Sequence, residues 1–273
     1  MAPAPHWNPL PADVRRGMHP ERPLGWHDYA DAWLDGPLGR FLDYGCGPGI
    51  LLRRVAPRCD EAWGVDVDHD TLPVSTEGFR VQAIAPDAPL PFEDGHFDTV
   101  SSLEVLEHVA DEGRMLGELA RVLRPGGRLV LTTPHKGLLT WLDPANFKFV
   151  LPRAHRLIHT GVLGDRAYYD GRFGDARRSE RKMLGDFTLD QDPWHRHYRL
   201  AEVLRFVPPS LELVDWAVYY PGMRASWVAS VGLRVLSRGR IGATPRWLER
   251  IKHDLSRRET MLGDQLVMRF RRR

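Results

Sequence analysis

Apolar and polar positions follow two different rhythms over residues 28–135. Short apolar runs of strand length occur at 39–45, 62–68, 79–88, 97–104 and 128–135. Segments with helical spacing lie between them, and the clearest of these, 112–127, places Met115, Leu116, Leu119, Val122 and Leu123 on one face. Alternation of strands and helices at this spacing predicts a parallel sheet that is covered by helices on both faces.

The rhythm breaks after His135. Residues 136–194 are poorly periodic and too many for a bare loop, so they predict a helical lid that determines substrate specificity. Residues 1–27 are rich in proline and predict an irregular arm. The C-terminal part, 195–273, resumes the core with a helix, a strand at 211–220, a helical insertion at about 223–262 and a last strand at 264–272. We therefore expect a cofactor-binding core at 28–135, which is followed by the insertion at 136–194 and completed by residues 195–273.

Composition narrows the class of protein. The chain has 273 residues, 42% of them hydrophobic, and a net charge of +2, so it suits one sizeable core and is no general polyanion binder. Positive charge is concentrated at 224–273, which suits either a solvated helix face or an anionic surface. The two cysteines, Cys46 and Cys59, have no disulfide or zinc spacing. With no signal peptide and no membrane-length apolar run, we expect a cytoplasmic protein.

A glycine-rich loop follows the first predicted strand in FLDYGCGPG, with Gly45, Gly47 and Gly49 at alternate positions. In an open parallel sheet, this loop lies where ligands bind. A phosphate-binding loop would continue with Lys and Ser or Thr, whereas Ile50 and Leu51 follow here, and the dinucleotide spacing GxGxxG is absent. The loop therefore predicts a ligand that passes close to the backbone without presenting a phosphate.

Two acids suggest what that ligand is. Asp43 precedes the loop and can hold an ammonium group, directly or through water. Asp66 ends the second predicted strand about 20 residues further on, where an acid accepts hydrogen bonds from both hydroxyls of a ribose. An ammonium group and a ribose without phosphates describe S-adenosylmethionine.

Five segments then resemble a known family in order and spacing: FLDYGCGPG, GVDVD, APDAPLPFEDGHFDTV, LEVLEHV and LRPGGRLVLTTP. The chain resembles the class I methyltransferases that use S-adenosylmethionine, in particular the small-molecule branch that includes the quinone-biosynthesis O-methyltransferases. The resemblance covers roughly residues 28–134 and the final strands. It implies an α/β, Rossmann-like, seven-stranded and mostly parallel sheet whose last strand is antiparallel.

The resemblance also implies roles around the methionine part of the cofactor. Gly45, Gly47 and Gly49 would let that part lie against the backbone. Asp43 would lie beneath its amino group, and Leu103, just past the fourth strand, would touch it.

Further roles are implied around the nucleoside. Asp66 would accept from the ribose hydroxyls, and Val67 would pack on the adenine. Asp87 would accept from the adenine amino group, with Ala88 supplying a backbone donor. Tyr29, upstream of the first strand, is a looser match for a side chain that closes over the cofactor.

Proton transfer has one candidate. His135, at the end of TTPH, lies where a base or a hydrogen-bond partner of the acceptor is expected, although an ordinary strand-end cap is the alternative. The residue differs from the amide frequent in related sequences, so this role is not carried over from the family. Glu104, Glu107 and His108 would share one helical face and offer a metal site, but a helix N-terminus explains the glutamates more simply.

The predicted function is transfer of a methyl group to a small-molecule acceptor, with a hydroxyl oxygen as the preferred position. One alternative is a methyltransferase-like binding module without catalysis, and another is C- or N-methylation of a lipid-linked or sugar acceptor. Arginines and aromatics in 147–182 suit an anionic acceptor, and amphipathic helices in 223–262 suit peripheral membrane contact. Neither nucleic acid nor a metal is expected as a partner, and a dehydrogenase is disfavoured by the glycine spacing.

Overall fold

The computed structural model describes residues 33–67, 72–86, 88–138, 140, 151–162, 164, 166, 196–219, 229, 232–233, 236–237 and 263–273. The predicted N-terminal arm, Tyr29, Asp87, most of the predicted lid and most of the helical insertion at about 223–262 lie outside these residues. Within the described part, every helix is too short or too polar to span a lipid bilayer.

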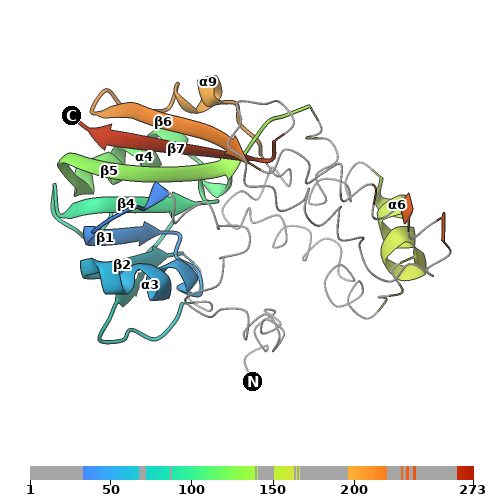
Figure 1. The fold of residues 1–273 in the computed structure, drawn as a ribbon, viewed down its shortest axis with the longest axis horizontal. Helices are drawn as coiled ribbons and strands as arrows, with labels where there is room; N and C mark the ends of the chain where they lie inside the picture. Colours follow the sequence, from blue (N-terminus) through green and yellow to red (C-terminus); the bar gives the residue numbers. More distant parts are fainter. Residues whose placement is uncertain are drawn as a thin grey trace.

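The described part is built on a seven-stranded sheet with the order β3-β2-β1-β4-β5-β7-β6 (Figure 1). The strands are β1 Gly39–Tyr44, β2 Cys59–Asp66, β3 Arg80–Ala83, β4 Phe97–Leu103, β5 Leu123–Pro134, β6 Leu211–Tyr219 and β7 Gln265–Arg272. The pairs among β1 to β5 are parallel, and β7 runs antiparallel to both β5 and β6. The predicted fold is therefore confirmed, apart from the lid. Strand order reverses between β1 and β4, which is the switch point where such sheets bind ligands.

Helices join and cover these strands. They are α3 Ile50–Val55, η2 Ala56–Arg58, η3 Leu106–His108, α4 Glu112–Val122, α6 Pro152–Leu157, the π-helical turn η5 Ile158–Val162, and α9 Leu200–Val203. The side chain of Asp111 caps α4 by accepting from Arg114 N at 2.9 Å. This helix ends earlier than predicted, because Leu123 already pairs with Phe97 of β4 before the Pro-Gly-Gly turn.

Each face of the sheet has its own apolar layer. One layer includes Leu116 and Leu119 of α4 and Val203 of α9, and the other includes Leu51 and Leu52 of α3. Alternation along β5 sends Leu129 and Leu131 to the first layer and Val130 to the second. Because successive strand residues point to opposite faces, Thr132 and Thr133 at the end of β5 also diverge.

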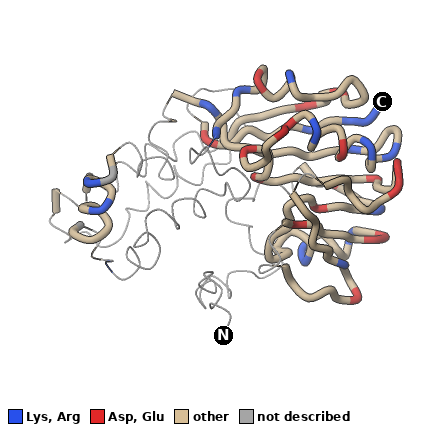
Figure 2. Tube along the Cα trace, turned by 180° about the vertical axis from the view of Figure 1, so that it is seen from behind, with Lys and Arg blue, Asp and Glu red and all other residues tan. Residues whose placement is uncertain are grey.

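The basic C-terminal end is the strand β7, as the pattern at 264–272 predicted. Arg269 lies 3.5 Å from Asp35, and Arg271 lies 3.7 Å from Glu212 of β6. Figure 2 shows acidic and basic positions interspersed along the described trace. Arg269 and Arg271 are thus locally compensated by acids of neighbouring segments, whereas Arg272 donates to the backbone carbonyls of Arg121 and Leu123.

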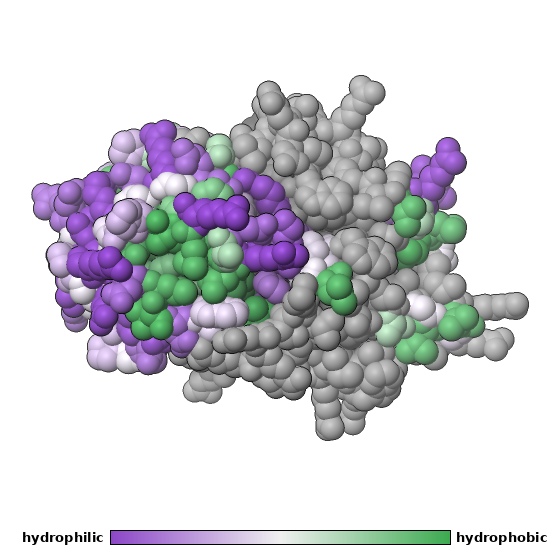
Figure 3. Space-filling view, turned by 90° about the horizontal axis from the view of Figure 1, so that it is seen from above, coloured by the Kyte–Doolittle hydropathy of each residue, from purple (hydrophilic) through white to green (hydrophobic). Residues whose placement is uncertain are grey.

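An apolar surface lies over α9 and β6, as the view from above shows (Figure 3). Leu204, just after α9, is 39% exposed, and Val214 of β6 is 52% exposed. The pairing of β6 with β7 shifts register between Leu213 and Asp215. A bulge of this kind in an edge strand opposes pairing with another chain.

Candidate functional site

The glycine loop connects the carboxyl end of β1 to α3. Gly45, Gly47 and Gly49 have φ values of 79°, 46° and 70°, a left-handed conformation that glycine adopts without steric cost. Gly45 N donates to Val65 O at 2.8 Å and Cys46 N donates to the same oxygen at 3.1 Å. These bonds hold the loop against the end of β2.

Two of these glycines also differ in what surrounds them. A Cβ on Gly45 would overlap Cγ2 of Val105, so the loop packs directly on the turn that follows β4. A Cβ on Gly47 would meet no described atom within 4 Å. The loop therefore touches the β4 turn at one glycine and offers open backbone at the next, which fits a ligand lying along the main chain.

Asp43 lies in β1 just before this loop and is 3% exposed. Its Oδ1 accepts a hydrogen bond from Ser101 Oγ of β4 at 2.7 Å. Burial raises the pKa of the Asp43 carboxyl from 3.8 to about 7, and the nearby charge of Asp66 adds to the effect. A cation placed beside this carboxyl would favour the ionised form, so the site is electrostatically suited to an ammonium group.

Asp66 ends β2 and faces the same loop. Its Oδ2 accepts a hydrogen bond from Gly47 N at 2.8 Å. Val67 follows and is half-buried against the apolar layer that includes α4. Ala88 N, the expected backbone donor to adenine, donates to Ala85 O at 3.2 Å within a turn, so a ligand would have to compete with this long bond.

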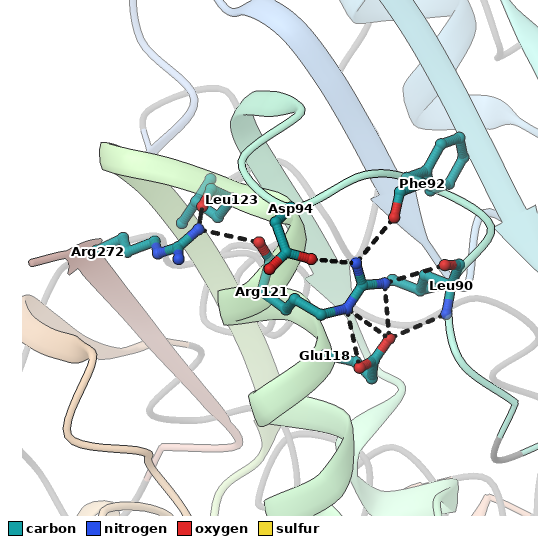
Figure 4. A network of polar contacts seen from close by, with 7 residues as sticks. All are labelled: Leu90, Phe92, Asp94, Glu118, Arg121, Leu123 and Arg272. Atoms are coloured by element: carbon teal, nitrogen blue, oxygen red, sulfur yellow. Dashed lines mark hydrogen bonds and ion pairs between the residues drawn. The ribbon is translucent and has the colours of Figure 1, made fainter.

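The segment after Ala88 is anchored to α4 by a polar network (Figure 4). Arg121 donates to Phe92 O at 2.8 Å and to Leu90 O at 3.0 Å, and it forms an ion pair with Asp94 at 2.8 Å. Glu118 accepts from Leu90 N at 3.0 Å. One arginine and one glutamate of α4 thus fix the path of the chain beside the predicted adenine position.

The turn after β4 carries a further carboxylate. Leu103 is 9% exposed at the end of the strand, and Glu104 follows with φ 57°. Oε1 of Glu104 accepts from Thr132 Oγ1 at 2.7 Å and from Gln265 Nε2. The glutamate is therefore held by two neighbouring strands, β5 and β7.

Glu107 lies on the opposite face of the same strand end. Its Oε2 accepts from Thr133 Oγ1 at 3.1 Å, and burial, followed by the nearby charge of Glu104, raises its pKa well above the ordinary value. The expectation that Glu104, Glu107 and His108 share one helical face is wrong, because Glu104 precedes the helical turn in a left-handed conformation. Within the described residues, no three His, Cys, Asp or Glu side chains come together as a metal-binding group.

His135 lies directly after β5 and is 8% exposed. Its Nδ1 is 3.0 Å from Gly263 O, and its backbone N donates to Asp264 O at 2.7 Å. Because a carbonyl oxygen only accepts, this contact requires the proton on Nδ1. The neutral ring then carries its lone pair on Nε2, which is the tautomer that a base requires.

A pocket of about 390 Å³ lies beyond the same strand end, between residues 136–140 and 196–206. Four of its charged residues form two ion pairs: Lys136 with Glu202 at 2.9 Å, and Arg196 with Glu112 at 2.8 Å. Tyr198 forms a parallel bridge with His135. The chain is thus back at the same sheet edge at Tyr198.

Sequence reasoning predicted the loop and the acids but missed their supports. Ser101 of β4 donates to Asp43, and Val105 in the turn after β4 packs against Gly45, but neither residue type is distinctive in a strand or turn. Gln265 reaches Glu104 from more than a hundred residues away. Arg121 had a detectable signal only in its position on the polar side of an amphipathic helix.

Comparisons with known proteins agree on one family. The sequence profile described as "Methyltransferase domain" matches residues 42–131. The ubiquinone biosynthesis O-methyltransferase of Burkholderia orbicola is 36% identical over 132 residues, which are 46% of this chain and 55% of that protein. The protein of the same name from Xanthomonas oryzae pv. oryzae is 28% identical over 188 residues, 64% of this chain and 75% of that protein. The chain thus spans about half the length of the first of these relatives.

A solved structure agrees on the fold. An S-adenosylmethionine-dependent methyltransferase from Mesorhizobium loti matches with a TM-score of 0.50 and 17% identity. The match covers 90% of this chain and 97% of that one. At this identity the likeness concerns the architecture alone, and it agrees with the strand order described above.

Proposed function

Since the chain carries a class I S-adenosylmethionine-dependent methyltransferase domain, we propose that it transfers a methyl group from that cofactor to a hydroxyl oxygen of a small molecule. One observation carries the proposal: a left-handed glycine loop without a phosphate-binding side chain lies between a buried carboxyl at the end of β1 and a second carboxylate at the end of β2. A ligand with an ammonium group and an unphosphorylated ribose satisfies both acids.

The residues that would hold the cofactor are distributed over three strand ends. Asp43 would hold the ammonium group, and the open backbone at Gly47 would pass beneath the methionine part. Asp66 would bind the ribose, and its carboxylate would then accept hydrogen bonds from both the ribose and Gly47 N. Leu103 would contact the methionine part. Tyr29 and Asp87, which lie outside the described residues, keep their proposed roles above the cofactor and at the adenine.

Methyl transfer requires little covalent chemistry from the protein. The cofactor supplies a methyl group on a positively charged sulfur, which is already activated for displacement. The chain must align the acceptor oxygen with that methyl group, exclude water and remove a proton. His135 is the candidate for contact with the acceptor, as a base or as a hydrogen-bond partner, and the proton on Nδ1 leaves its Nε2 suited to either role.

The acceptor is proposed to be a small hydroxyl compound, by analogy with relatives named as O-methyltransferases of ubiquinone biosynthesis. An anionic group or a lipid tail on the acceptor is a further part of the proposal. Its support is compositional, since the arginine- and aromatic-rich stretch lies mostly outside the described residues. C- and N-methylation stay as alternatives that the product will distinguish.

Two measurements test the proposal in sequence. Isothermal titration with S-adenosylhomocysteine should give a dissociation constant in the micromolar range, with NAD and ATP as control ligands that do not bind. Incubation with S-adenosylmethionine and a panel of phenols, amines and activated carbon acids should then give a product 14 mass units heavier, which is the mass of one added methylene. Binding of NAD in place of S-adenosylhomocysteine would refute the family assignment of the loop. Cofactor binding without any methylated product would favour the binding-module alternative.

A further inference from the structure

Glu104 lies beside the loop that is proposed to bind the methyl donor. It directly follows Leu103, and its other neighbour, Val105, is the side chain on which Gly45 packs. Glu104 and the glycine loop therefore lie at the carboxyl ends of two neighbouring parallel strands, at the switch point between β1 and β4. A side chain that leaves this turn toward β5 extends along the edge where an acceptor would meet the methyl group.

The backbone of Glu104 is held in an unfavourable conformation. Its φ is 57°, and among the residues that the structure describes it is the one non-glycine residue with a positive φ. Left-handed backbone is disfavoured for a residue with a Cβ, and it persists where the surroundings impose it, which is frequent at functional sites. Here the surroundings are identifiable, because Glu104 N donates to both Thr132 O and Thr132 Oγ1.

The carboxylate of Glu104 is also fixed in direction. Thr132 Oγ1 of β5 and Gln265 Nε2 of β7 both donate to Oε1. Two donors from adjacent strands hold the group across the carboxyl edge of the sheet, on the face shared with Leu103. A glutamate placed only to cap a turn would need one such donor, whereas two donors and a strained backbone specify the position of a functional group.

Glu107 provides the internal comparison. It belongs to the same turn, but it points to the opposite face, is 1% exposed and accepts from Thr133. Burial disfavours the charged form of the Glu107 carboxyl and so raises its pKa, whereas Glu104 is only half-buried and lies on the face shared with Leu103.

We propose that Glu104 is the base that takes the proton of the acceptor hydroxyl, with Thr132 and Gln265 holding its carboxylate in place. This inference rests on the proposed function. The acceptor O–H bond breaks and its proton moves to a Glu104 oxygen while the acceptor oxygen forms a bond to the methyl carbon. The methyl–sulfur bond breaks with its electron pair going to sulfur, which leaves a neutral thioether. Glu104 then releases the proton to water, and His135 keeps the role of hydrogen-bond partner.

The test compares Glu104→Gln with Glu104→Asp and with the matched control Glu107→Gln. The probe acceptor is catechol or, if the wild-type chain prefers it, another phenol from a panel selected for turnover by that chain. Glu104→Gln should bind S-adenosylhomocysteine within threefold of wild type and melt within a few degrees of it, and its kcat should fall at least 100-fold. Glu104→Asp should retain part of the activity. Glu107→Gln resembles the neutral acid already present and should stay within fivefold of wild type.

The pH profile separates a base from a residue that merely supports the turn. The wild-type kcat/KM should fall on the acid side as the carboxylate becomes protonated, and Glu104→Gln should lose that limb while keeping its residual activity. Turnover of Glu104→Gln within threefold of wild type would refute the role of Glu104 and leave the proposed function intact. Activity that EDTA abolishes and Mg²⁺ restores would assign the carboxylate to a cation and overturn direct proton transfer. Absence of cofactor binding by the wild-type chain would refute both.

Discussion

Asp43 should make cofactor binding depend on pH. The pKa of its buried carboxyl is raised to about 7 in the chain without ligand, chiefly because burial disfavours the charge. A bound ammonium group would hold the carboxyl in its ionised form, so binding requires the loss of a proton below pH 7. The affinity should therefore rise with pH in this range, and Asp43→Asn should remove the dependence.

The magnitude follows from the fraction of Asp43 that is ionised. With a pKa of about 7, about one tenth of the carboxyl is ionised at pH 6 and about nine tenths at pH 8. Binding should therefore be about tenfold tighter at pH 8 than at pH 6. Asp43→Asn should bind about 10- to 100-fold more weakly than wild type at pH 8, because it loses a charge-assisted hydrogen bond.

Stability should change in the opposite sense. The folded chain holds the Asp43 proton up to about pH 7, whereas the unfolded chain releases it near 3.8. The folded state thus binds more protons between these values, and its stability declines as the pH rises from about 4 to 7, by about 4 kcal/mol in total. Asp43→Asn should lack this decline, so above pH 7 the variant without ligand should be the more stable protein.

The assay is isothermal titration of wild type and Asp43→Asn with S-adenosylhomocysteine at pH 6 and pH 8, paired with urea unfolding at the same pH values. A matched control ligand is 5′-methylthioadenosine, which lacks the ammonium group and should bind equally at both pH values. An equal affinity of the wild type for S-adenosylhomocysteine at pH 6 and 8 would contradict the reasoning. So would a tenfold pH effect that survives in Asp43→Asn.

Three further substitutions probe the neighbouring contacts. Asp66→Ala should weaken S-adenosylhomocysteine binding by about 1–3 kcal/mol, measured by titration, because it removes a charge-assisted acceptor; unchanged affinity would remove Asp66 from the site. Gly45→Ala should lower the free energy of unfolding by about 2–4 kcal/mol, since its Cβ would overlap Val105 and its φ is 79°. The double variant Gly45→Ala, Val105→Ala should recover the stability lost to the overlap with Val105, but not the stability lost to the left-handed backbone. Full recovery of the free energy of unfolding in urea would show that the backbone strain is negligible. Arg121→Ala should cost about 1–3 kcal/mol in stability, because two backbone carbonyls lose their donor. It should also weaken the binding of S-adenosylhomocysteine more than the binding of methionine, which lacks the adenine. Equal effects on the two ligands would show that the Arg121 network does not support the adenine position.

Most of the fold could be predicted from local patterns in the sequence. The apolar run at 39–45, the glycines after it and the amphipathic segment at 112–127 each specify their own conformation, so β1, the loop and α4 were predictable. The boundary between α4 and β5 was not, because pairing of Leu123 with Phe97 decides it and that contact is distant in sequence. Likewise, α9 spans only Leu200–Val203, although the apolar spacing continues to residue 207.

The candidate site divides in the same way. Asp43 and Asp66 could be predicted, because their positions at strand ends fix where their carboxylates lie. Glu104 was predicted to lie on a helix, as a metal ligand or as a carboxylate at the helix N-terminus, since nothing in LEVLEHV indicates the left-handed backbone that β5 and β7 impose on it. Contacts across strands made the difference, and a single sequence does not report them.

Because β7 lies between β5 and β6, the sheet can be completed only after the C-terminal strand has been synthesised. A ribosome that has translated residue 219 has completed β6, yet the strand that joins β6 to the rest of the sheet begins only at Gln265. Until then a nascent chain would leave the edge of β5 unpaired and β6 without its partner strand. A polypeptide halted before Gln265 would therefore lack both the completed sheet and the side chain that donates to Glu104.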